Sequence, residues 1–367
     1  MKRSTNIINN IIYFLITMAT LFLVVVTFNQ RYNEGAFLSI TTFVIGAIMA
    51  GIINTFAHEF GHYFAGKKNG FVFSCMCVWF FKWTKVNKQV RFNFVMIGEE
   101  AGYTEMIPTS KDSLDRKLAG MTRGGIIASL LMLLIGIPPI FIKSLPSFIY
   151  AIWSIFLPIG CYYFFGSFLP TSSEGILNDG AVIRGIKKKY DAMTVTLSIL
   201  AIQSEMYNGK TPSEIDEGLY FNLPQLPEDD PNFALLLDAR YCYYLDNGDY
   251  ENAKKASDRM LSIVEYMPKN YKIQAKLNCL YNACTFDYNE DVADDIMYDI
   301  ERFLNNVNTA STVRVKLAYL INIKGEIDSF DIFYKKGLKE ADRCQIKGLG
   351  RFERKLFERL KADYEKK

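Results

Sequence analysis

Four long apolar runs constrain this chain more than any other feature of its sequence. A hydrocarbon core of about 30 Å takes about 20 residues of helix to cross, and each run is near or above that length. The runs are residues 7–28, 37–65, 124–142 and 148–169. The first is too long for the apolar part of a signal peptide, and no small-residue cleavage pattern follows it, so we expect a retained anchor. The sequence therefore predicts a polytopic, mainly α-helical membrane protein.

Lysine and arginine gather at one set of loop ends, and this asymmetry predicts an orientation. They precede the first and third runs and follow the second and fourth, as is typical of cytoplasmic flanks. These residues are Lys2, Arg3, Lys67, Lys68, Lys111, Arg116, Lys117, Arg123, Lys187, Lys188 and Lys189. The opposite loops carry Arg31 and Lys143 alone. We therefore expect a multi-pass protein of the cell membrane with both termini cytoplasmic.

Composition divides the chain into two predicted domains. Residues 1–189 hold the apolar runs, whereas residues 190–367 are rich in charged residues and tyrosine. Within the first domain, residues 70–108 are aromatic and β-branched, which favours two to four strands in a small sheet associated with the membrane. The net charge of +3, without a basic stripe that aromatic residues interrupt, argues against nucleic-acid binding. The seven cysteines form no CxxC pair, and we expect free thiols.

One motif carries the chemistry. The second run ends in His58-Glu59-Phe60-Gly61-His62, which contains both histidines of the chain. Positions i and i+4 of a helix face the same way, so both imidazoles can bind one zinc ion. Glu59 can act as general base on a zinc-bound water, whose pKa the metal lowers towards about 7. Ionisable residues inside a membrane span are unfavourable, which favours a metal site over two interfacial histidines near a helix end.

The third metal ligand has to be a carboxylate, because a catalytic zinc ion usually has three protein ligands and no further histidine exists. Candidates follow the fourth run. We expect Asp179 as the ligand, since Pro170 ends the span and Gly180 lets the backbone approach closely. Glu174 is the alternative ligand. Asp179 could instead be an ordinary cap of a helix expected at residues 181–187.

The HExxH motif inside a span, with Asp179-Gly180 after a later one, resembles the site-2 protease family of intramembrane metalloproteases. The resemblance covers about residues 38–185 and includes Gly124-Gly125 at the start of the third run. It implies hydrolysis of membrane-anchored protein substrates within or beside the bilayer, in a bacterial plasma membrane. It also implies one Zn²⁺ per chain, held by three ligands beside one catalytic carboxylate. In this sequence these are His58, His62 and Asp179, with Glu59 as the catalytic residue.

Two serines depart from the family pattern. Ser129 stands where the third motif usually has asparagine, and Ser167 stands before the Leu-Pro of the last motif. In the family such an asparagine is associated with holding or polarising the substrate. A serine hydroxyl can still donate one hydrogen bond, so we expect Ser129 and Ser167 to bind or polarise the substrate.

Cleavage inside a transmembrane helix requires local unwinding, and an extended segment can be held by pairing with an open sheet edge. We expect the strands within residues 71–108 to offer such an edge to an unwound substrate segment. Alternatively, the sheet merely covers the zinc site.

The second domain has helical periodicity that resembles a tetratricopeptide-like array. Helix pairs are expected near residues 239–253, 277–293 and 317–338, with turns at Asn247-Gly248-Asp249, near Asp287–Asn289 and at Lys324-Gly325-Glu326. Such an array usually binds a partner protein on its concave face, although it could instead only stabilise or oligomerise an enzyme. The alternative to a protease is an inactive membrane scaffold in which this array is the working part.

Overall fold

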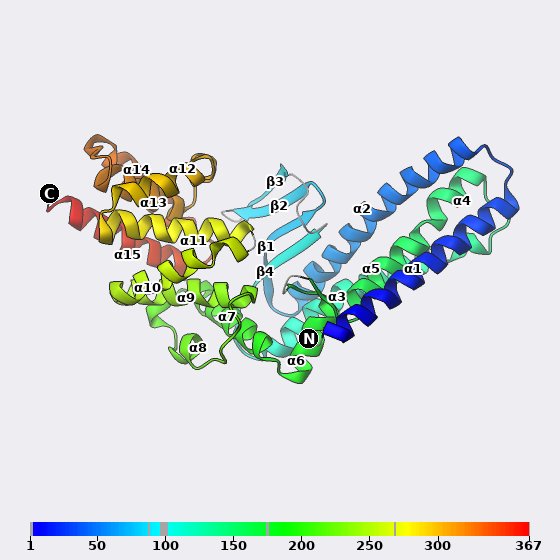
Figure 1. Ribbon diagram of the computed structural model, residues 1–367, viewed down its shortest axis with the longest axis horizontal. Coiled ribbons are helices and arrows are strands. Elements are labelled where there is room, and N and C mark those ends of the chain that lie inside the picture. The colour runs from blue at the N-terminus through cyan, green and yellow to red at the C-terminus, as the bar shows by residue number, and fades with distance from the viewer. Residues whose placement is uncertain (1–2, 87–88, 96–101, 174–175, 268, 367) are drawn as a thin grey trace. The chain divides into compact units, whose positions relative to one another are not determined.

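The computed structural model describes residues 3–86, 89–95, 102–173, 176–267 and 269–366. It is mainly helical, with a small sheet, and it divides into two compact units (Figure 1). The first unit consists of Met1–Lys85, Val90–Ile107 and Ser113–Tyr190, and the second of Val86–Gln89, Pro108–Asp112 and Asp191–Lys367.

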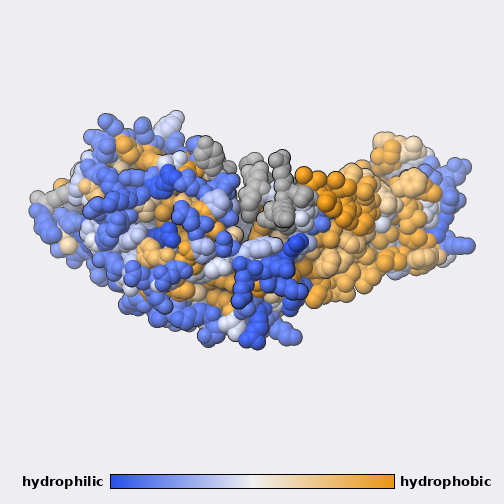
Figure 2. All heavy atoms as spheres, turned by 60° about the horizontal axis from the view of Figure 1, so that its bottom comes forward, coloured by the Kyte–Doolittle hydropathy of each residue, from blue (hydrophilic) through white to orange (hydrophobic). Residues whose placement is uncertain are grey.

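Four helical segments of the first unit are long and apolar enough to cross a membrane. They are α1 (Arg3–Arg31), α2 (Ala36–Lys68), α3 (Leu114–Ile135) with the 3-10 turn η1 (Pro138–Ile140), and the pair α4 (Ser147–Ser154) and α5 (Phe156–Phe168). Figure 2 shows hydrophobic side chains gathered over these helices. The prediction of a mainly α-helical chain with four apolar helices and a small sheet is confirmed at this level.

Two of the helical segments differ in extent from the apolar runs that they contain. The third helix begins at Leu114, well before residue 124, because its polar first turns still bury Leu114 and Ala119. The fourth run is broken at Ile155 into α4 and α5. Pro158 lies in the first turn of α5 and lacks the N–H that would continue the helix from Ser154, which accounts for the break.

Arg31, at the end of α1, has a structural role that the charge asymmetry did not predict. Its guanidinium donates hydrogen bonds to the carbonyl oxygens of Pro139 and Ile142, both at 3.1 Å, and to that of Ile140. It also lies 5.4 Å from the centre of the Tyr150 ring. These carbonyl oxygens follow the end of α3, where no further helical turn supplies backbone N–H donors. Arg31 therefore donates to oxygens that would otherwise lack a donor.

The sheet follows α2 and contains four strands in the order β3-β2-β1-β4. The strands are β1 (Phe71–Val78), β2 (Phe81–Val86), β3 (Gln89–Phe94) and β4 (Gly102–Pro108). Trp79, in the turn between β1 and β2, has a left-handed φ of 55°, which is unusual for a bulky residue. Its indole packs on Gly51 of α2 and donates a hydrogen bond of 3.1 Å to Thr55, so this turn fixes the sheet to α2.

After α5 the chain forms two very short strands and a helix that bring it back to α2 and α3. These are β5 (Ser172–Ser173), β6 (Ile176–Leu177) and α6 (Asp179–Lys188). Asn6 of α1 accepts a hydrogen bond from the backbone N–H of Ser172 at 2.9 Å and donates one to its carbonyl oxygen at 2.7 Å. The segment before α6 is thereby tied to the first helix.

The second unit consists of helices. It begins with α7 (Asp191–Tyr207), η2 (Pro212–Glu214) and α8 (Gly218–Phe221). Helix pairs follow: α9 (Pro231–Asn247) and α10 (Tyr250–Ser262), α11 (Lys269–Asn282) and α12 (Glu290–Asn306), and α13 (Ala310–Asn322) and α14 (Phe330–Asp342). Short turns η3 (Val264–Tyr266), η4 (Ala283–Asp287) and η5 (Ile327–Ser329) connect them, and α15 (Lys347–Tyr364) ends the unit. The turns expected near residues 247, 288 and 325 lie between the helices of these pairs.

Helix α15 closes this array. It packs on α13 and α14, which precede it, and also on α7 at the start of the unit. Arg351 pairs with Glu214 of η2 at 2.9 Å, while Phe357 and Leu360 are buried in the main core of the unit. The last helix therefore joins the beginning of the array to its end.

A buried ion pair lies within this packing. The Arg314 guanidinium of α13 donates two hydrogen bonds to the Glu353 carboxylate of α15, at 2.7 and 3.2 Å. Both side chains are 4% exposed, and the guanidinium stacks 4.1 Å from the ring centre of Tyr281. Nε and Nη2 meet the two carboxylate oxygens in a fork, the geometry in which an arginine–carboxylate pair is strongest, while Nη1 has no acceptor among the described residues.

Candidate metal centre

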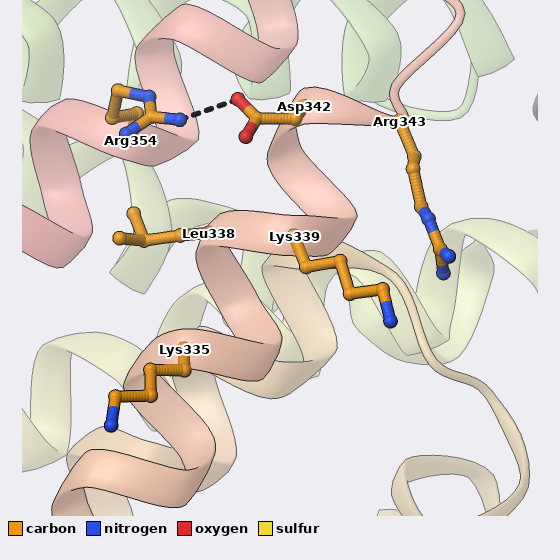
Figure 3. Close-up of a pocket in the computed structure, with 6 residues that line it drawn as sticks. All are labelled: Lys335, Leu338, Lys339, Asp342, Arg343 and Arg354. Atoms are coloured by element: carbon orange, nitrogen blue, oxygen red, sulfur yellow. Dashed lines mark hydrogen bonds and ion pairs between the residues drawn. The ribbon is translucent and has the colours of Figure 1, made fainter.

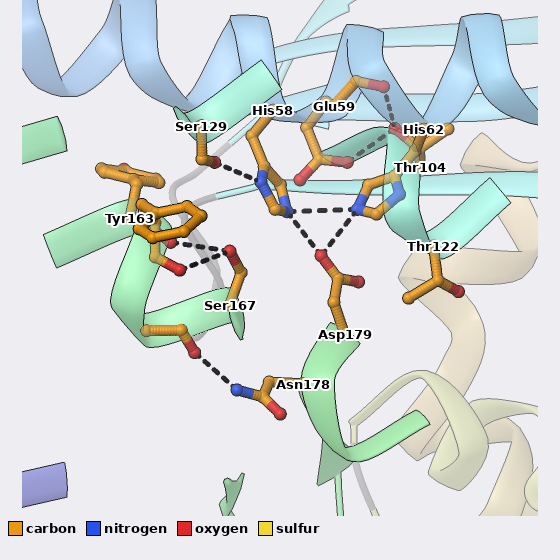
Figure 4. A network of polar contacts seen from close by, with 12 residues as sticks. His58, Glu59, His62, Thr104, Thr122, Ser129, Tyr163, Ser167, Asn178 and Asp179 are labelled. Carbon is orange, nitrogen blue, oxygen red and sulfur yellow. Dashed lines mark hydrogen bonds and ion pairs between the residues drawn. The ribbon is translucent and has the colours of Figure 1, made fainter. Parts of the chain in front are cut away.

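Three side chains converge between α2 and the start of α6 (Figure 4). The Nε2 atoms of His58 and His62, on successive turns of α2, are 3.1 Å apart. The Asp179 Oδ2 atom lies 3.3 Å from each of them. The structure thus brings together His58, His62 and Asp179 as the sequence predicts.

The triangle has the size that a tetrahedral zinc ion requires. Bonds of about 2.0–2.1 Å with tetrahedral angles separate ligand atoms by about 3.3–3.4 Å. The observed edges are 3.1, 3.3 and 3.3 Å. Asp179 Oδ2 is buried and has no hydrogen-bond donor within the described residues. A buried acceptor in this situation is unfavourable unless a cation lies beside it, so the donor set fits a metal ion.

The second ring nitrogen of each histidine is also engaged, and both partners belong to α3. His62 Nδ1 lies 3.2 Å from the carbonyl oxygen of Met121, which can only accept, so this nitrogen carries the hydrogen. A neutral His62 then presents a lone pair at Nε2. His58 Nδ1 lies 2.8 Å from the Ser129 hydroxyl. Partners of this kind orient metal-binding imidazoles.

Asn178, rather than Asp179, caps the helix that carries the third ligand. The Asn178 side chain accepts the N–H of Ala181 at 2.9 Å and donates to the carbonyl oxygen of Leu169 at 2.7 Å. Asp179, in the first turn of α6, is left to face the histidines. The alternative of Asp179 as an ordinary cap was therefore wrong. Glu174, the alternative ligand, lies outside the described residues.

A positive charge beside Asp179 keeps its carboxyl ionised. Burial alone would raise its pKa, but the neighbouring imidazoles of His62 and His58, when protonated, lower the pKa to about 2. An ionised carboxylate is the form that binds a metal ion.

Glu59 lies beside the triangle and is 4% exposed. Its Oε2 accepts a hydrogen bond of 2.6 Å from the Thr104 hydroxyl of β4. Gly102, at the start of the same strand, is so close that an added Cβ would lie 3.0 Å from Glu59 Oε1. An end strand of the sheet thus runs along the candidate catalytic carboxylate. Sequence reasoning missed Thr104, whose only signal was its place in the expected strand region.

Glycines set the distance between α2 and α3 at the site. A Cβ on Gly61 would meet the carbonyl oxygen of Gly124 at 2.3 Å, so the two backbones are in direct contact. A Cβ on Gly125 would lie 2.4 Å from His62 Nε2 and 2.9 Å from the His58 ring. Larger residues at these positions would push the histidines out of place.

Neither of the two expected polarising serines directs its hydroxyl to the metal triangle. Ser129 is fully buried behind His58, on the side of Nδ1. Ser167 donates its hydroxyl hydrogen to the carbonyl oxygens of Tyr163 and Phe164 in its own helix, at 2.8 and 3.2 Å. The structure therefore places the Ser129 hydroxyl against His58 Nδ1 and that of Ser167 in a bond within α5.

A cavity of about 560 Å³ opens beside the three converging side chains. Residues from α1, α2, α3, β4, α5, β6 and α6 line it, among them Glu59, Thr104, Tyr163, Ser167 and Leu177. One wall is fixed by Thr55, whose hydroxyl is 2.5 Å from that of Tyr163 and 3.1 Å from the indole nitrogen of Trp79. The space is sufficient for a short stretch of extended chain.

Comparison of the chain with protein-family models, with curated proteins and with solved structures finds no match. Three atoms that could bind one metal ion, an adjacent carboxylate and a cavity beside them can together support metal-assisted hydrolysis.

Proposed function

We propose that this chain is an intramembrane zinc metalloprotease of the site-2 protease type, which hydrolyses peptide bonds of membrane-anchored protein substrates. One observation carries the proposal: His58, His62 and Asp179 converge within 3.3 Å, with Glu59 beside them, at a helix apolar enough to cross a membrane. Three protein ligands with an open fourth position are typical of catalytic zinc sites, whereas structural sites use four.

The residues around the site have complementary roles in this reaction. When bound, zinc supplies Lewis-acid polarisation of a water molecule and of the scissile carbonyl. Glu59 accepts a proton from the attacking water and passes it to the leaving nitrogen. Thr104 occupies Glu59 Oε2 at 2.6 Å, which leaves Oε1 to take the proton. Ser129 and the carbonyl of Met121 hold the two imidazoles in orientation.

Strand β4 is the surface that supports substrate binding best. It lies at one end of the described sheet and contacts Glu59 through Thr104. An unwound substrate segment that pairs with β4 would satisfy its backbone groups and pass beside the catalytic carboxylate. A helix-breaking residue near the cut site should therefore speed cleavage, and equal cleavage of rigid helical substrates would contradict strand pairing.

The four apolar helices would cross the membrane with both termini cytoplasmic, because basic residues flank them on that side. The second unit would then lie in the cytoplasm, where partner proteins or substrate tails can reach it.

The decisive experiment combines metal content with cleavage, using purified protein in neutral detergent. The wild type is expected to contain one zinc ion per chain and to lose activity with a chelator. Glu59→Gln should retain zinc and lose at least about 10²-fold in cleavage rate, the contribution of a general base. Asp179→Asn should lose both zinc and activity.

Matched controls separate these effects from charge removal in general. Asp115→Asn removes an exposed carboxyl in the first turn of α3, and Asp191→Asn removes one in the first turn of α7. Both should behave as the wild type. A zinc-free wild type that is indifferent to chelators would overturn the proposal in favour of a membrane scaffold.

A further inference from the structure

The end of the second unit has a charge opposite to the rest of that unit. Residues 331–367 contain 12 Lys and Arg against 7 Asp and Glu, whereas residues 191–330 contain 12 against 23. Four of these cations line a cavity of about 470 Å³ on α14 and α15 (Figure 3). We name it the basic pocket, and its lining residues are Lys335, Leu338, Lys339, Asp342, Arg343 and Arg354.

The two lysines of the basic pocket have no counter-charge among the described residues. Arg354 donates a hydrogen bond of 2.5 Å to Asp342, and Arg343 bonds Glu340 at 2.9 Å. Within the described part of the chain, no ion pair or hydrogen bond reaches Lys335 or Lys339. Figure 3 shows both extending from α14 without a contact to the other residues drawn.

Most other lysines of the same unit are paired, with Lys336 and Lys347 as the exceptions among the described side chains. Lys254 bonds Asp287 at 2.5 Å, Lys276 bonds Asp299 at 2.7 Å, and further pairs are as close. The abundance of acidic residues makes such partners easy to supply. Two cations kept apart from them form a local positive field that can attract an anionic ligand.

Like charges follow one another along the part of α14 that lines the basic pocket. Lys335, Lys339 and Arg343 stand at intervals of four residues along and just past the helix, a spacing at which like charges repel. The helix dipole favours Lys339 in the last turn and offsets part of this repulsion. An anionic ligand would relieve the rest.

The shape and lining of the basic pocket identify the class of ligand. A recess between helices receives individual side chains, whereas a bilayer surface needs an exposed apolar or basic face. The lining contains no aromatic ring, among the described residues, on which a nucleic-acid base could stack. Leu338 and the aliphatic stems of the lysines supply apolar surface beside the charges. Ile332, one turn before Lys335, is 69% exposed and extends this apolar surface along α14.

We propose that the basic pocket binds an acidic segment of a partner protein. Carboxylates of the segment pair with Lys335 and Lys339, and a neighbouring aliphatic side chain packs on Leu338. This role is separate from peptide hydrolysis, and it holds for an inactive chain as well as for an active one.

Peptide binding to the full-length protein tests the proposal. The probe is a fluorescent synthetic peptide of Glu and Asp residues with a single Leu, titrated with protein in neutral detergent and followed by anisotropy. Binding should weaken as salt is added, because exposed charges are screened. The double variant Lys335→Gln with Lys339→Gln should lower affinity about tenfold, as expected when two complementary charges are removed. Leu338→Ser should lower it less.

The control keeps the same change in net charge. Lys254→Gln with Lys255→Gln removes two exposed lysines on α10 and should leave peptide affinity unchanged. An equal loss in this control would overturn the proposal, because binding would then follow net charge alone. Circular dichroism of both double variants should match the wild type, since the substitutions lie on the surface.

Competition identifies the source of the anion. Vesicles of phosphatidylglycerol or a single-stranded oligonucleotide should displace the peptide only weakly. Displacement by either one that depends on Lys335 and Lys339 would overturn the assignment to an acidic protein segment. The measurements can be repeated with Glu59→Gln, so a failure here leaves the proposed hydrolysis unaffected.

Discussion

Both units bury charged groups, but they satisfy them in opposite ways. In the second unit, Arg314 donates two hydrogen bonds to Glu353 and no cation is needed. In the first unit, two imidazole nitrogens and a carboxylate oxygen face one another within 3.3 Å, and Asp179 Oδ2 has no hydrogen-bond donor among the described residues. A buried cluster with matched donors and acceptors is a structural element. A buried cluster of acceptors alone requires a ligand.

The largest expected effect comes from breaking the matched cluster. Glu353→Gln leaves the Arg314 guanidinium buried without its counter-charge and should destabilise the second unit by about 3–5 kcal/mol. Hydrogen exchange of peptides from α13 and α15, in the full-length protein, measures this change. The double variant Arg314→Met with Glu353→Leu should recover most of the loss, because buried pairs can be replaced by apolar residues. Equal destabilisation in the single and double variants would contradict a matched pair.

The next effect concerns the unmatched cluster and depends on zinc. Asp179→Asn removes the carboxylate that would pair with the bound cation, so its effect on stability should be larger in zinc than in chelator. Zinc at a hundred times its dissociation constant should stabilise the wild type by about 2.7 kcal/mol and the variant hardly at all. Thermal unfolding with chelator and with zinc gives both values. A variant that zinc stabilises as much as the wild type would exclude Asp179 as a ligand.

A smaller effect, on zinc affinity, should distinguish Ser129 from Ser167. Ser129→Ala removes the partner of His58 Nδ1 and should weaken zinc affinity about tenfold, the lower end of what such partners contribute. Ser167→Ala is the matched control, because its hydroxyl bonds its own helix, and zinc affinity should not change. Competition with a fluorescent chelator measures both. Unchanged zinc affinity with slower cleavage in Ser129→Ala would return that residue to the substrate-polarising role.

The smallest effect is a pH dependence in the second unit. Burial alone would raise the pKa of Asp246, but hydrogen bonds from Lys355 at 2.8 Å and Ser213 at 2.6 Å hold it below its ordinary value. A depressed carboxyl pKa stabilises the fold above the unfolded pKa of about 3.9, and this stability is lost as pH falls below that value. The free energy of unfolding, measured with urea at pH 6 and below pH 4, should therefore change less with pH in Asp246→Asn than in the wild type. Lys355 is 45% exposed, so solvent screening keeps the effect small.

The parts of the fold that depend on local pattern could be predicted from the sequence. Hydrophobic length indicated the four apolar helices, and the Gly248-Asp249 turn pointed to the pair α9 and α10. Long-range packing could not be predicted. The return of α15 to α7 depends on contacts such as Arg351 with Glu214, which are 137 residues apart in the chain.

The same division applies to the site. His58, Glu59 and His62 lie on one helix, and their spacing alone determines which way their side chains face. The sequence therefore indicated these residues directly. Thr104 and Ser129 reach Glu59 and His58 from other elements, and nothing in their own sequence surroundings indicates these contacts. Asn178 and Asp179 are adjacent and can both cap a helix, so only the folded chain distinguishes the cap from the ligand.

The contact of Gly61 with Gly124 has a consequence beyond the shape of the site. It fixes the crossing of α2 and α3 at one height along α2, and His58 and His62 lie within a turn of that point. In the proposed enzyme this height is a depth in the bilayer. A substrate would then be selected by which of its peptide bonds lies at that depth, so moving a cleavable segment by one helical turn should abolish cutting without any change in its sequence.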